Sequence, residues 1–173
     1  GPVLIDITKD AQFENLEFNY KYCSKIRSYF PIPKLNHSLL KEASKLINNA
    51  RKPLLIIGQG IILSKAENEL LKFVDKSGVP VASTLLGLGS FPNNHTNYVG
   101  YLGMHGNYAP NIMTNKCDVL IAIGMRFDDR VTGNTEKYAK QAKVIHIDID
   151  KAELNKIIPT KIPIHADAKD ALN

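Results

Sequence analysis

The sequence predicts an α/β fold in which a parallel β-sheet is flanked by helices. Short, continuously apolar runs such as residues 53–58 and 117–123 are typical of strands that are buried on both faces of a sheet. Helical patterns or loops separate these runs, and such alternation favours parallel pairing through right-handed crossovers. The chain has 173 residues, of which 44% are hydrophobic, and this is enough for one domain with its own core.

The N-terminal part is expected to be less regular. Residues 3–7 (VLIDI) predict a short strand, after which residues 11–36 lack a clear period and carry Pro31 and Pro33. Such a stretch is typical of a linker that crosses a surface. A helix is expected next, because apolar residues recur at helical spacing over residues 39–47, with Asn36 or Ser38 as its N-cap.

The remaining elements alternate along the chain. We expect strands at residues 53–58, 79–83, 117–123, 143–147 and 162–165. We expect helices at residues 66–74, ended by Gly78, at residues 107–115, and after Asp167. Residues 84–105, rich in glycine and asparagine, predict a long loop, and loops of this length are usually functional or disordered.

Composition and spacing argue against several function classes. The net charge is +5, but the lysines are scattered, which favours a solvated surface over a nucleic-acid interface. The sequence has no apolar run of roughly 18 residues and no His, Cys and carboxylate set with metal-site spacing. Neither Cys23 nor Cys117 has a CxxC partner, and Cys117 is expected to be a small buried hydrophobe. We therefore expect no nucleic acid, membrane or metal ion as a partner of this chain.

The residues that suggest a binding site follow the expected strands. In parallel α/β sheets, ligands bind beyond the carboxyl ends of the strands. Gly58-Gln59-Gly60 follows the first of these strands and would either bring backbone N–H groups close to a phosphate or simply form a turn. The full G-x-G-x-x-G pattern is absent, because Leu63 occupies its last position. Thr84 could donate to a ligand or to its own backbone.

Charged residues mark later strand ends. Arg126 and Arg130 follow the strand at residues 117–123, and their guanidinium groups would match a pyrophosphate, although a surface cluster with the two intervening aspartates explains them equally. Asp148 and Asp167 end two further strands and are either partners of a ribose hydroxyl or solvated strand ends. In the segment 102–106, glycines flank a Met-His pair and bring backbone close to a ligand. Together these features indicate a dinucleotide-binding α/β domain, without naming a reaction.

Four segments carry a resemblance to a known family. Residues 80–90 (PVASTLLGLGS), 102–106 (LGMHG), 124–133 (GMRFDDRVTG) and 144–150 (VIHIDID) resemble the acetolactate synthase large-subunit family. The RFDDRVTG string is highly specific, and the resemblance covers essentially the whole chain. It implies a Rossmann-like parallel sheet flanked by helices, the central domain of thiamine-diphosphate-dependent enzymes.

The resemblance also implies domain boundaries. Residues 1–6 (GPVLID) resemble the final strand of the pyrimidine-binding domain that precedes the central domain in that family. Residues 1–10 would then be the end of that preceding domain, residues 11–36 a linker, and residues 37–173 a central FAD-binding α/β domain.

The resemblance further implies a cofactor and the residues that contact it. FAD is expected to lie on this domain and to do no net redox work. The family usually shows three glycines where this chain has Gly58-Gln59-Gly60, so the side chain of Gln59 would enter space that the cofactor uses. By motif, the expected FAD-binding residues are Gly58, Gln59, Gly60, Thr84, Leu85, Leu102, Gly103, Met104, His105, Gly124, Arg126, Asp129, Arg130, Val131, Asp148, Ile149, Asp167 and Ala168.

Activity and partners follow from the same resemblance. Full-length members condense two pyruvates, or pyruvate and 2-oxobutyrate, with CO2 release in branched-chain amino-acid biosynthesis, and they use thiamine diphosphate and Mg²⁺ besides FAD. The expected partners are the remaining domains of the same large subunit, further full-length chains in a homodimer or tetramer, and a regulatory small subunit. The expected compartment is the cytoplasm of a bacterium, or an organelle stroma or matrix in a eukaryote.

This chain alone is expected to be inactive, because the sequence contains no Gly-Asp-Gly segment to hold Mg²⁺ and the diphosphate. Two alternatives remain open. One is the central domain of another thiamine-diphosphate enzyme, of the carboligase or decarboxylase type, that binds FAD or ADP, including one used for regulation or assembly. The other is an NAD-dependent enzyme of the related deacylase type, which would need a catalytic histidine beside a fuller glycine pattern.

Overall fold

The computed structural model describes residues 2–24 and 30–173, which fall into two compact units divided between Phe30 and Pro31. In the described part of the first unit, the one regular element is helix α1 (Lys9–Phe13). The strand predicted at residues 3–7 is wrong, because these residues form neither helix nor strand and are exposed. A strand needs a neighbour to satisfy its backbone N–H and C=O groups. Gly1 and residues 25–29, which belong to the predicted terminal segment and linker, lie outside the described residues.

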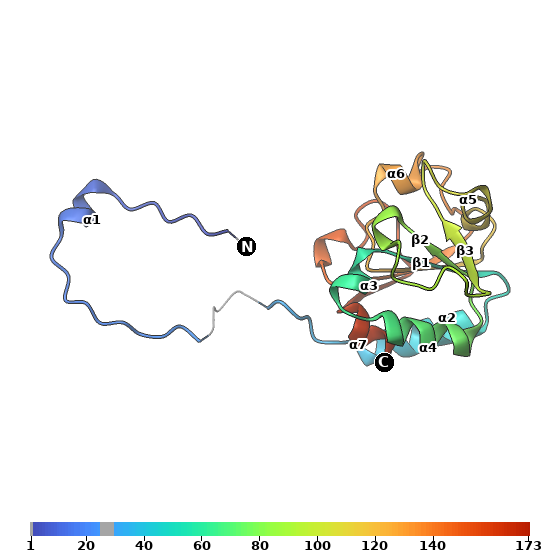
Figure 1. Ribbon diagram of the computed structural model, residues 1–173, viewed down its shortest axis with the longest axis horizontal. Coiled ribbons are helices and arrows are strands. Elements are labelled where there is room, and N and C mark those ends of the chain that lie inside the picture. The colour runs from blue at the N-terminus through green and yellow to red at the C-terminus, as the bar shows by residue number, and fades with distance from the viewer. Residues whose placement is uncertain (1, 25–29) are drawn as a thin grey trace. The chain divides into compact units, whose positions relative to one another are not determined.

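A six-stranded, all-parallel sheet forms the centre of the second unit (Figure 1). The spatial order of its strands is β3-β2-β1-β4-β5-β6. The chain therefore runs outward from β1 to one edge, returns to the centre at β4, and runs outward to the other edge. This order reverses between β1 and β4, which is where ligands bind in such sheets. The strands are β1 (Pro53–Ile57), β2 (Val81–Ser83), β3 (Tyr98–Tyr101), β4 (Val119–Ile123), β5 (Lys143–Asp148) and β6 (Ile162–His165).

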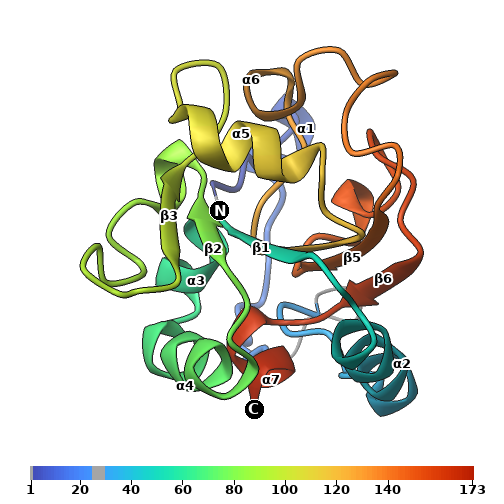
Figure 2. The same ribbon diagram turned by 90° about the vertical axis from the view of Figure 1, so that its right-hand side faces the viewer.

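Helices cover both faces of the sheet (Figure 2). On one face lie α2 (His37–Asn48), α4 (Glu67–Ser77) and α7 (Ala168–Leu172), and on the other lies α5 (Tyr108–Thr114). Short elements come next in the chain after four strands: α3 (Gln59–Leu63) after β1, the 3-10 helix η1 (Leu85–Gly87) after β2, α6 (Asp129–Thr132) after β4, and the 3-10 helix η2 (Lys151–Glu153) after β5. In the part of the chain that the structure describes, no helix has both the length and the apolar composition needed to cross a membrane.

The apolar runs of the central strands have a direct structural cause. Leu55 and Ile57 of β1 belong to the core cluster beneath α2, α4 and α7, whereas Leu54 and Ile56 belong to the cluster on the α5 face. All four are fully buried, as expected for a strand covered on both faces. The fold class predicted from the sequence is confirmed.

Most of the predicted elements are confirmed as well. Helix α2 begins after Asn36, whose side chain accepts hydrogen bonds from the N–H groups of Ser38 (3.0 Å) and Leu39 (3.4 Å). Helix α4 ends at Gly78, which has a left-handed φ of 67°. The prediction that residues 84–105 are only a loop is wrong, because they contain η1 and the strand β3. As an edge strand, β3 is half-buried and lacks the continuous apolar run that marks the central strands.

Candidate functional site

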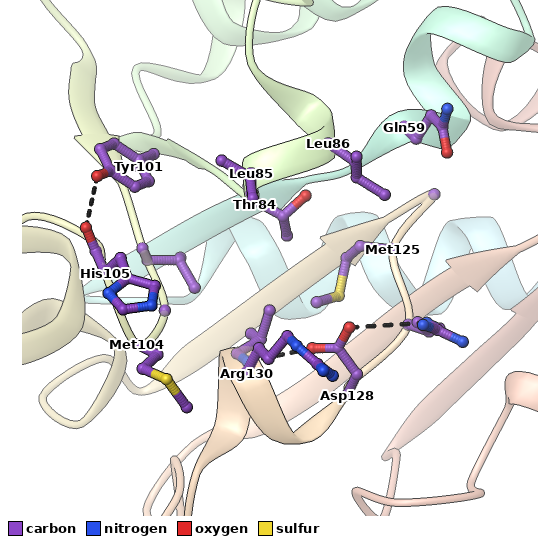
Figure 3. A pocket seen from close by; sticks show the side chains of 15 residues that line it. Gln59, Thr84, Leu85, Leu86, Tyr101, Met104, His105, Met125, Asp128 and Arg130 are labelled. Atoms are coloured by element: carbon purple, nitrogen blue, oxygen red, sulfur yellow. Dashed lines mark hydrogen bonds and ion pairs between the residues drawn. The ribbon is translucent and has the colours of Figure 1, made fainter.

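A cavity of about 690 Å³ lies at the carboxyl edge of the sheet, around the point where the strand order reverses. Its walls come from the segments that follow β1, β2, β3 and β4. Figure 3 shows Thr84, Leu85 and Leu86 on one side, with Met125, Asp128 and Arg130 opposite them. A volume of this size is in the range of small-molecule and cofactor pockets. The lining residues are Gln59, Thr84, Leu85, Leu86, Tyr101, Leu102, Gly103, Met104, His105, Gly124, Met125, Arg126, Asp128, Arg130 and Val131.

The turns after β1 and β4 are packed backbone against backbone beside this cavity. The N–H of Gly58 donates to Ile123 O at 3.0 Å, and the N–H of Gly60 donates to Gly124 O at 2.9 Å. A Cβ atom added at Gly60 would lie 2.5 Å from the Cα of Gly124, so no side chain fits there. Gly58 and Gly60 do not line the cavity, and their N–H groups bond the last residue of β4 and the first residue after it. Gln59, between them, is exposed and lines the cavity, which keeps its volume with that side chain in place.

A second wall is the segment after β3, and a side-chain amide fixes it. The side chain of Asn111 on α5 accepts from the N–H of Gly103 and donates to the carbonyl oxygen of the same residue, both at 3.0 Å. Gly103 has a φ of 111°, which favours glycine. The next N–H, that of Met104, donates to Arg130 O at 2.7 Å. Helices α5 and α6 are thus connected through this segment.

Two arginines lie at the cavity, and their ion pairs are weak. The Nε of Arg126 lies 3.7 Å from Asp128 Oδ2, and the Arg126 side chain is 67% exposed. The pair of Arg130 and Asp129 is closer, at 3.1 Å, but both side chains are about three-quarters exposed. Asp128 is only 27% exposed, but its distance from Arg126 is long, and exposed pairs such as that of Arg130 contribute roughly 0–1 kcal/mol. A phosphate could therefore replace these aspartates as the partner of the guanidinium groups, while Asp128 keeps its N-cap bond from the N–H of Val131 at 3.1 Å. The geometry thus accommodates both interpretations of the arginines.

A buried histidine contacts the turn 124–126, which carries Arg126. His146 on β5 is fully buried, and its Nε2 lies 2.8 Å from the carbonyl oxygen of Met125. The ring of Phe127 meets its ring edge to face at 4.9 Å. Burial lowers the pKa of His146, whereas burial raises the pKa of Asp148, whose Oδ2 lies 3.9 Å from His146 Nε2.

The predicted residues at and after the carboxyl ends of β5 and β6 lie at the same edge of the sheet but outside the cavity. Asp148 accepts from the N–H of Asp150 at 2.8 Å, and Asp167 caps α7 by accepting from the N–H of Lys169 at 2.8 Å. A carboxylate has further acceptor sites, so these bonds leave room for a ligand hydroxyl. Ile149 is exposed and Ala168 is buried, and neither lines the cavity.

The structure thus brings most of the predicted site residues together. Those that line the cavity are Gln59, Thr84, Leu85, Leu102, Gly103, Met104, His105, Gly124, Arg126, Arg130 and Val131. Those that do not are Gly58, Gly60, Asp129, Asp148, Ile149, Asp167 and Ala168. The sequence interpretation missed Leu86, Tyr101, Met125 and Asp128, all of which adjoin predicted residues. It also missed His146 and Asn111, whose roles depend on partners 21 and 8 residues away.

The sheet order and the cavity at its reversal point place the chain in the Rossmann-like class of α/β domains. Comparison of the sequence with protein families narrows this class, because the model of the thiamine pyrophosphate enzyme central domain matches residues 40–173. The chain belongs to this family.

Individual relatives agree with the family and confirm the resemblance to acetolactate synthase large subunits. The chain is 43% identical over 172 residues to the acetolactate synthase large subunit of Corynebacterium glutamicum, covering 99% of this chain and 28% of that protein. It is 45% identical to a probable acetolactate synthase large subunit of Methanocaldococcus jannaschii (99% of this chain, 30% of the relative). It is 44% identical to the chloroplastic acetolactate synthase 2 of Nicotiana tabacum (99% and 26%). The chain therefore spans less than a third of the length of these relatives.

Proposed function

We propose that this chain is the FAD-binding central domain of an acetolactate synthase large subunit. The observation that carries the proposal is the cavity at the reversal point of the sheet, with Arg126 and Arg130 at its wall. The high identity to acetolactate synthase large subunits over 99% of the chain supports the choice of enzyme.

The residues present fit such a cofactor. Arg126 and Arg130 would bind the two phosphates, because guanidinium groups match phosphate oxygens. The ion pairs that the two arginines make with Asp128 and Asp129 are weak and would compete little with the phosphates. Leu85, Leu86 and Met104 are exposed apolar side chains on the cavity and would pack against a flat ring. When bound, FAD would supply that flavin ring, and the family resemblance implies no net redox step.

The adenosine half is proposed to extend along the same edge toward the ends of β5 and β6. Asp148 and Asp167 would accept hydrogen bonds from ribose hydroxyls with acceptor sites that their local bonds leave open. Ile149, which is exposed, would border the base with its side chain, and Ala168, which is buried, would do so with its backbone.

The full-length protein is proposed to condense two pyruvates, or pyruvate and 2-oxobutyrate, with release of CO2. Exposed apolar residues support contacts with the remaining domains of such a subunit. They are Leu63 on α3 and Leu88 directly after η1 in the second unit, and Val3, Leu4 and Phe13 in the first. The chain alone is proposed to be inactive, since it has no Gly-Asp-Gly segment. A turnover assay with pyruvate, thiamine diphosphate, Mg²⁺ and FAD tests this, and acetolactate above the blank would disprove it.

Separate titrations of FAD, ADP and NAD into the purified chain, followed by calorimetry, test the binding proposal. We expect FAD and ADP to bind and NAD to bind more weakly. A ligand at 100 times its Kd should also raise the free energy of unfolding by about 2.7 kcal/mol. Binding of ADP without any gain from the flavin half would favour an ADP-binding module, and tight binding of NAD alone would favour the deacylase-type alternative. Absence of binding by all three would contradict the proposal.

A further inference from the structure

His146 has a bonding pattern that simple core filling does not explain. Its side chain is fully buried on the α5 face of β5, the same face as Val144. A carbonyl oxygen only accepts hydrogen bonds, so the Nε2 that lies 2.8 Å from Met125 O must carry the proton. Nδ1 is then an acceptor, and among the described residues it is buried without a hydrogen-bond partner. Burying an unsatisfied polar atom is unfavourable, so an apolar residue would fill this space at lower cost.

The side chain of His146 makes one hydrogen bond among the described residues, and this bond acts on the turn 124–126, which carries Arg126. The N–H of Gly60 donates to the carbonyl oxygen of Gly124 at 2.9 Å, and Nε2 of His146 donates to the carbonyl oxygen of the next residue, Met125. Two successive peptide groups are therefore fixed, one by the turn after β1 and the other by β5. Arg126 follows immediately, and its own ion pair, at 3.7 Å, is too long and too exposed to fix its position. The backbone before Arg126 thus decides where its side chain begins.

We propose that His146 is a positioning residue for the cofactor site: through the carbonyl group of Met125, it holds the turn 124–126 so that Arg126 faces the cavity. This inference rests on the proposed function, in which Arg126 binds a phosphate of FAD. It adds a residue that touches neither the cavity nor the ligand.

Three substitutions of His146 separate positioning from space filling: glutamine is compared first with methionine and then with asparagine. The amide nitrogen of glutamine stands as many bonds from the backbone as His Nε2, so His146→Gln keeps a donor for Met125 O, while His146→Met has similar length and no donor. If His146 only fills an apolar layer, methionine should be tolerated better than glutamine. If it positions the turn, glutamine should rescue binding and methionine should not. His146→Asn is polar like glutamine but one bond shorter, so it should behave like methionine; it serves if the methionine variant fails to fold.

The experiment measures the Kd of FAD for the wild-type chain and for the three variants, each with Arg126 intact and with Arg126→Ala. We expect the methionine and asparagine variants to bind about tenfold more weakly than wild type, and the glutamine variant within about threefold. With Arg126 already removed, the substitutions at His146 should change Kd by less than about twofold, because their effect passes through Arg126. The free energy of unfolding of each unliganded variant is measured alongside. A merely structural role would change that free energy, and the effect of the substitution on Kd would then be the same with Arg126 intact and with Arg126→Ala.

Two results would overturn the inference alone. One is wild-type binding with methionine or asparagine in place of His146, and the other is an equal loss whether or not Arg126 is present. Absence of FAD binding by the wild-type chain would instead overturn the proposed function, and this inference with it.

Discussion

Gly60 and Gly124 meet backbone to backbone, with the N–H of Gly60 donating to the carbonyl oxygen of Gly124 at 2.9 Å. A Cβ atom built on Gly124 would lie 2.6 Å from the Cα of Gly60, and Gly124 itself has a left-handed φ of 60°. This contact joins the turns after β1 and β4, which are the two strands between which the sheet order reverses. The cavity wall therefore depends on a junction that admits no side chain.

Gly124→Ala should accordingly lower the free energy of unfolding by about 2–4 kcal/mol, from left-handed strain and a backbone clash together. Gly78→Ala is the matched control, because Gly78 has a φ of 67° and nothing within 4 Å of an added Cβ. That variant should lose only about 1 kcal/mol. Urea unfolding of both measures the difference, and equal losses would mean that the junction is not tight.

Asn111→Ala should loosen the segment that forms the wall after β3. The substitution removes both hydrogen bonds to Gly103. The N–H and C=O groups of Gly103 are partly buried, and leaving them unpaired should lower the free energy of unfolding by about 1–3 kcal/mol. Amide hydrogen exchange at Gly103 and Met104 should accelerate more than exchange in the central strands. Asn134→Ala, which removes an exposed turn bond to Glu136 N–H, is the control. Unchanged exchange at Gly103 would show that the clamp is dispensable.

Replacement of the two arginines should weaken FAD and ADP binding. Arg126→Ala and Arg130→Ala are each expected to raise Kd by about 10-fold to 100-fold, since a charge-assisted bond to phosphate is worth roughly 1.5–3 kcal/mol. Arg51→Ala makes the same charge change two residues before β1, at the opposite edge of the sheet, and should leave Kd within about twofold. If Arg51→Ala weakened binding as much, overall charge rather than the cavity would explain the affinity.

Acidification should destabilise the wild-type chain through His146. Burial holds its pKa in the folded protein below the ordinary value of 6.5, so the unfolded chain takes up the proton first as the pH falls. The neutral ring's contribution to stability is complete above about pH 6.5 and is lost below it, by up to about 1.4 kcal/mol per pH unit. Unfolding free energies of wild type and His146→Gln should therefore diverge between about pH 7.5 and about pH 5.5. Parallel curves would contradict this.

Cys117 should resist alkylation in the folded chain. It is buried, its thiol donates to Thr114 O at 3.1 Å, and burial raises the pKa of Cys117 to about 11. At about pH 8, only about 0.1% would be thiolate, the reactive form. Mass spectrometry after iodoacetamide treatment should find Cys23, which is exposed, modified far sooner, and urea should abolish the difference. Comparable rates in the folded chain would show that Cys117 is accessible.

The central strands were predictable because burial on both faces leaves a local mark. Strands β1 and β4 are runs of five residues without a polar side chain, and parallel pairing follows from the helices between them. Strand β3 carries no such mark, since an edge strand is half-buried and includes Gly100. The apolar segment at residues 3–7 does carry a strand pattern, but it has no neighbouring strand in the described part of the chain.

The cavity wall was predictable where residues follow strand ends, as with Thr84, Gly103 and Arg126. Gly58 and Gly60 show the limit of that rule, because their position at a strand end serves the contact with Gly124 and not the cavity surface. His146 and Asn111 leave no local sign, since each acts on a backbone group brought to it by tertiary packing.

The most direct test of the proposed site is a map of the backbone amide shifts of the chain with and without FAD. We expect the largest changes at residues 101–105 and 124–131, which surround the cavity at the carboxyl edge. A second, smaller hollow lies at the opposite edge. Lys45, Lys143 and Lys161 line it together with Glu42, and an anion there would bind through charge alone. Changes confined to those lysines, with residues 101–105 and 124–131 unaffected, would contradict the assignment of the cavity as the FAD site.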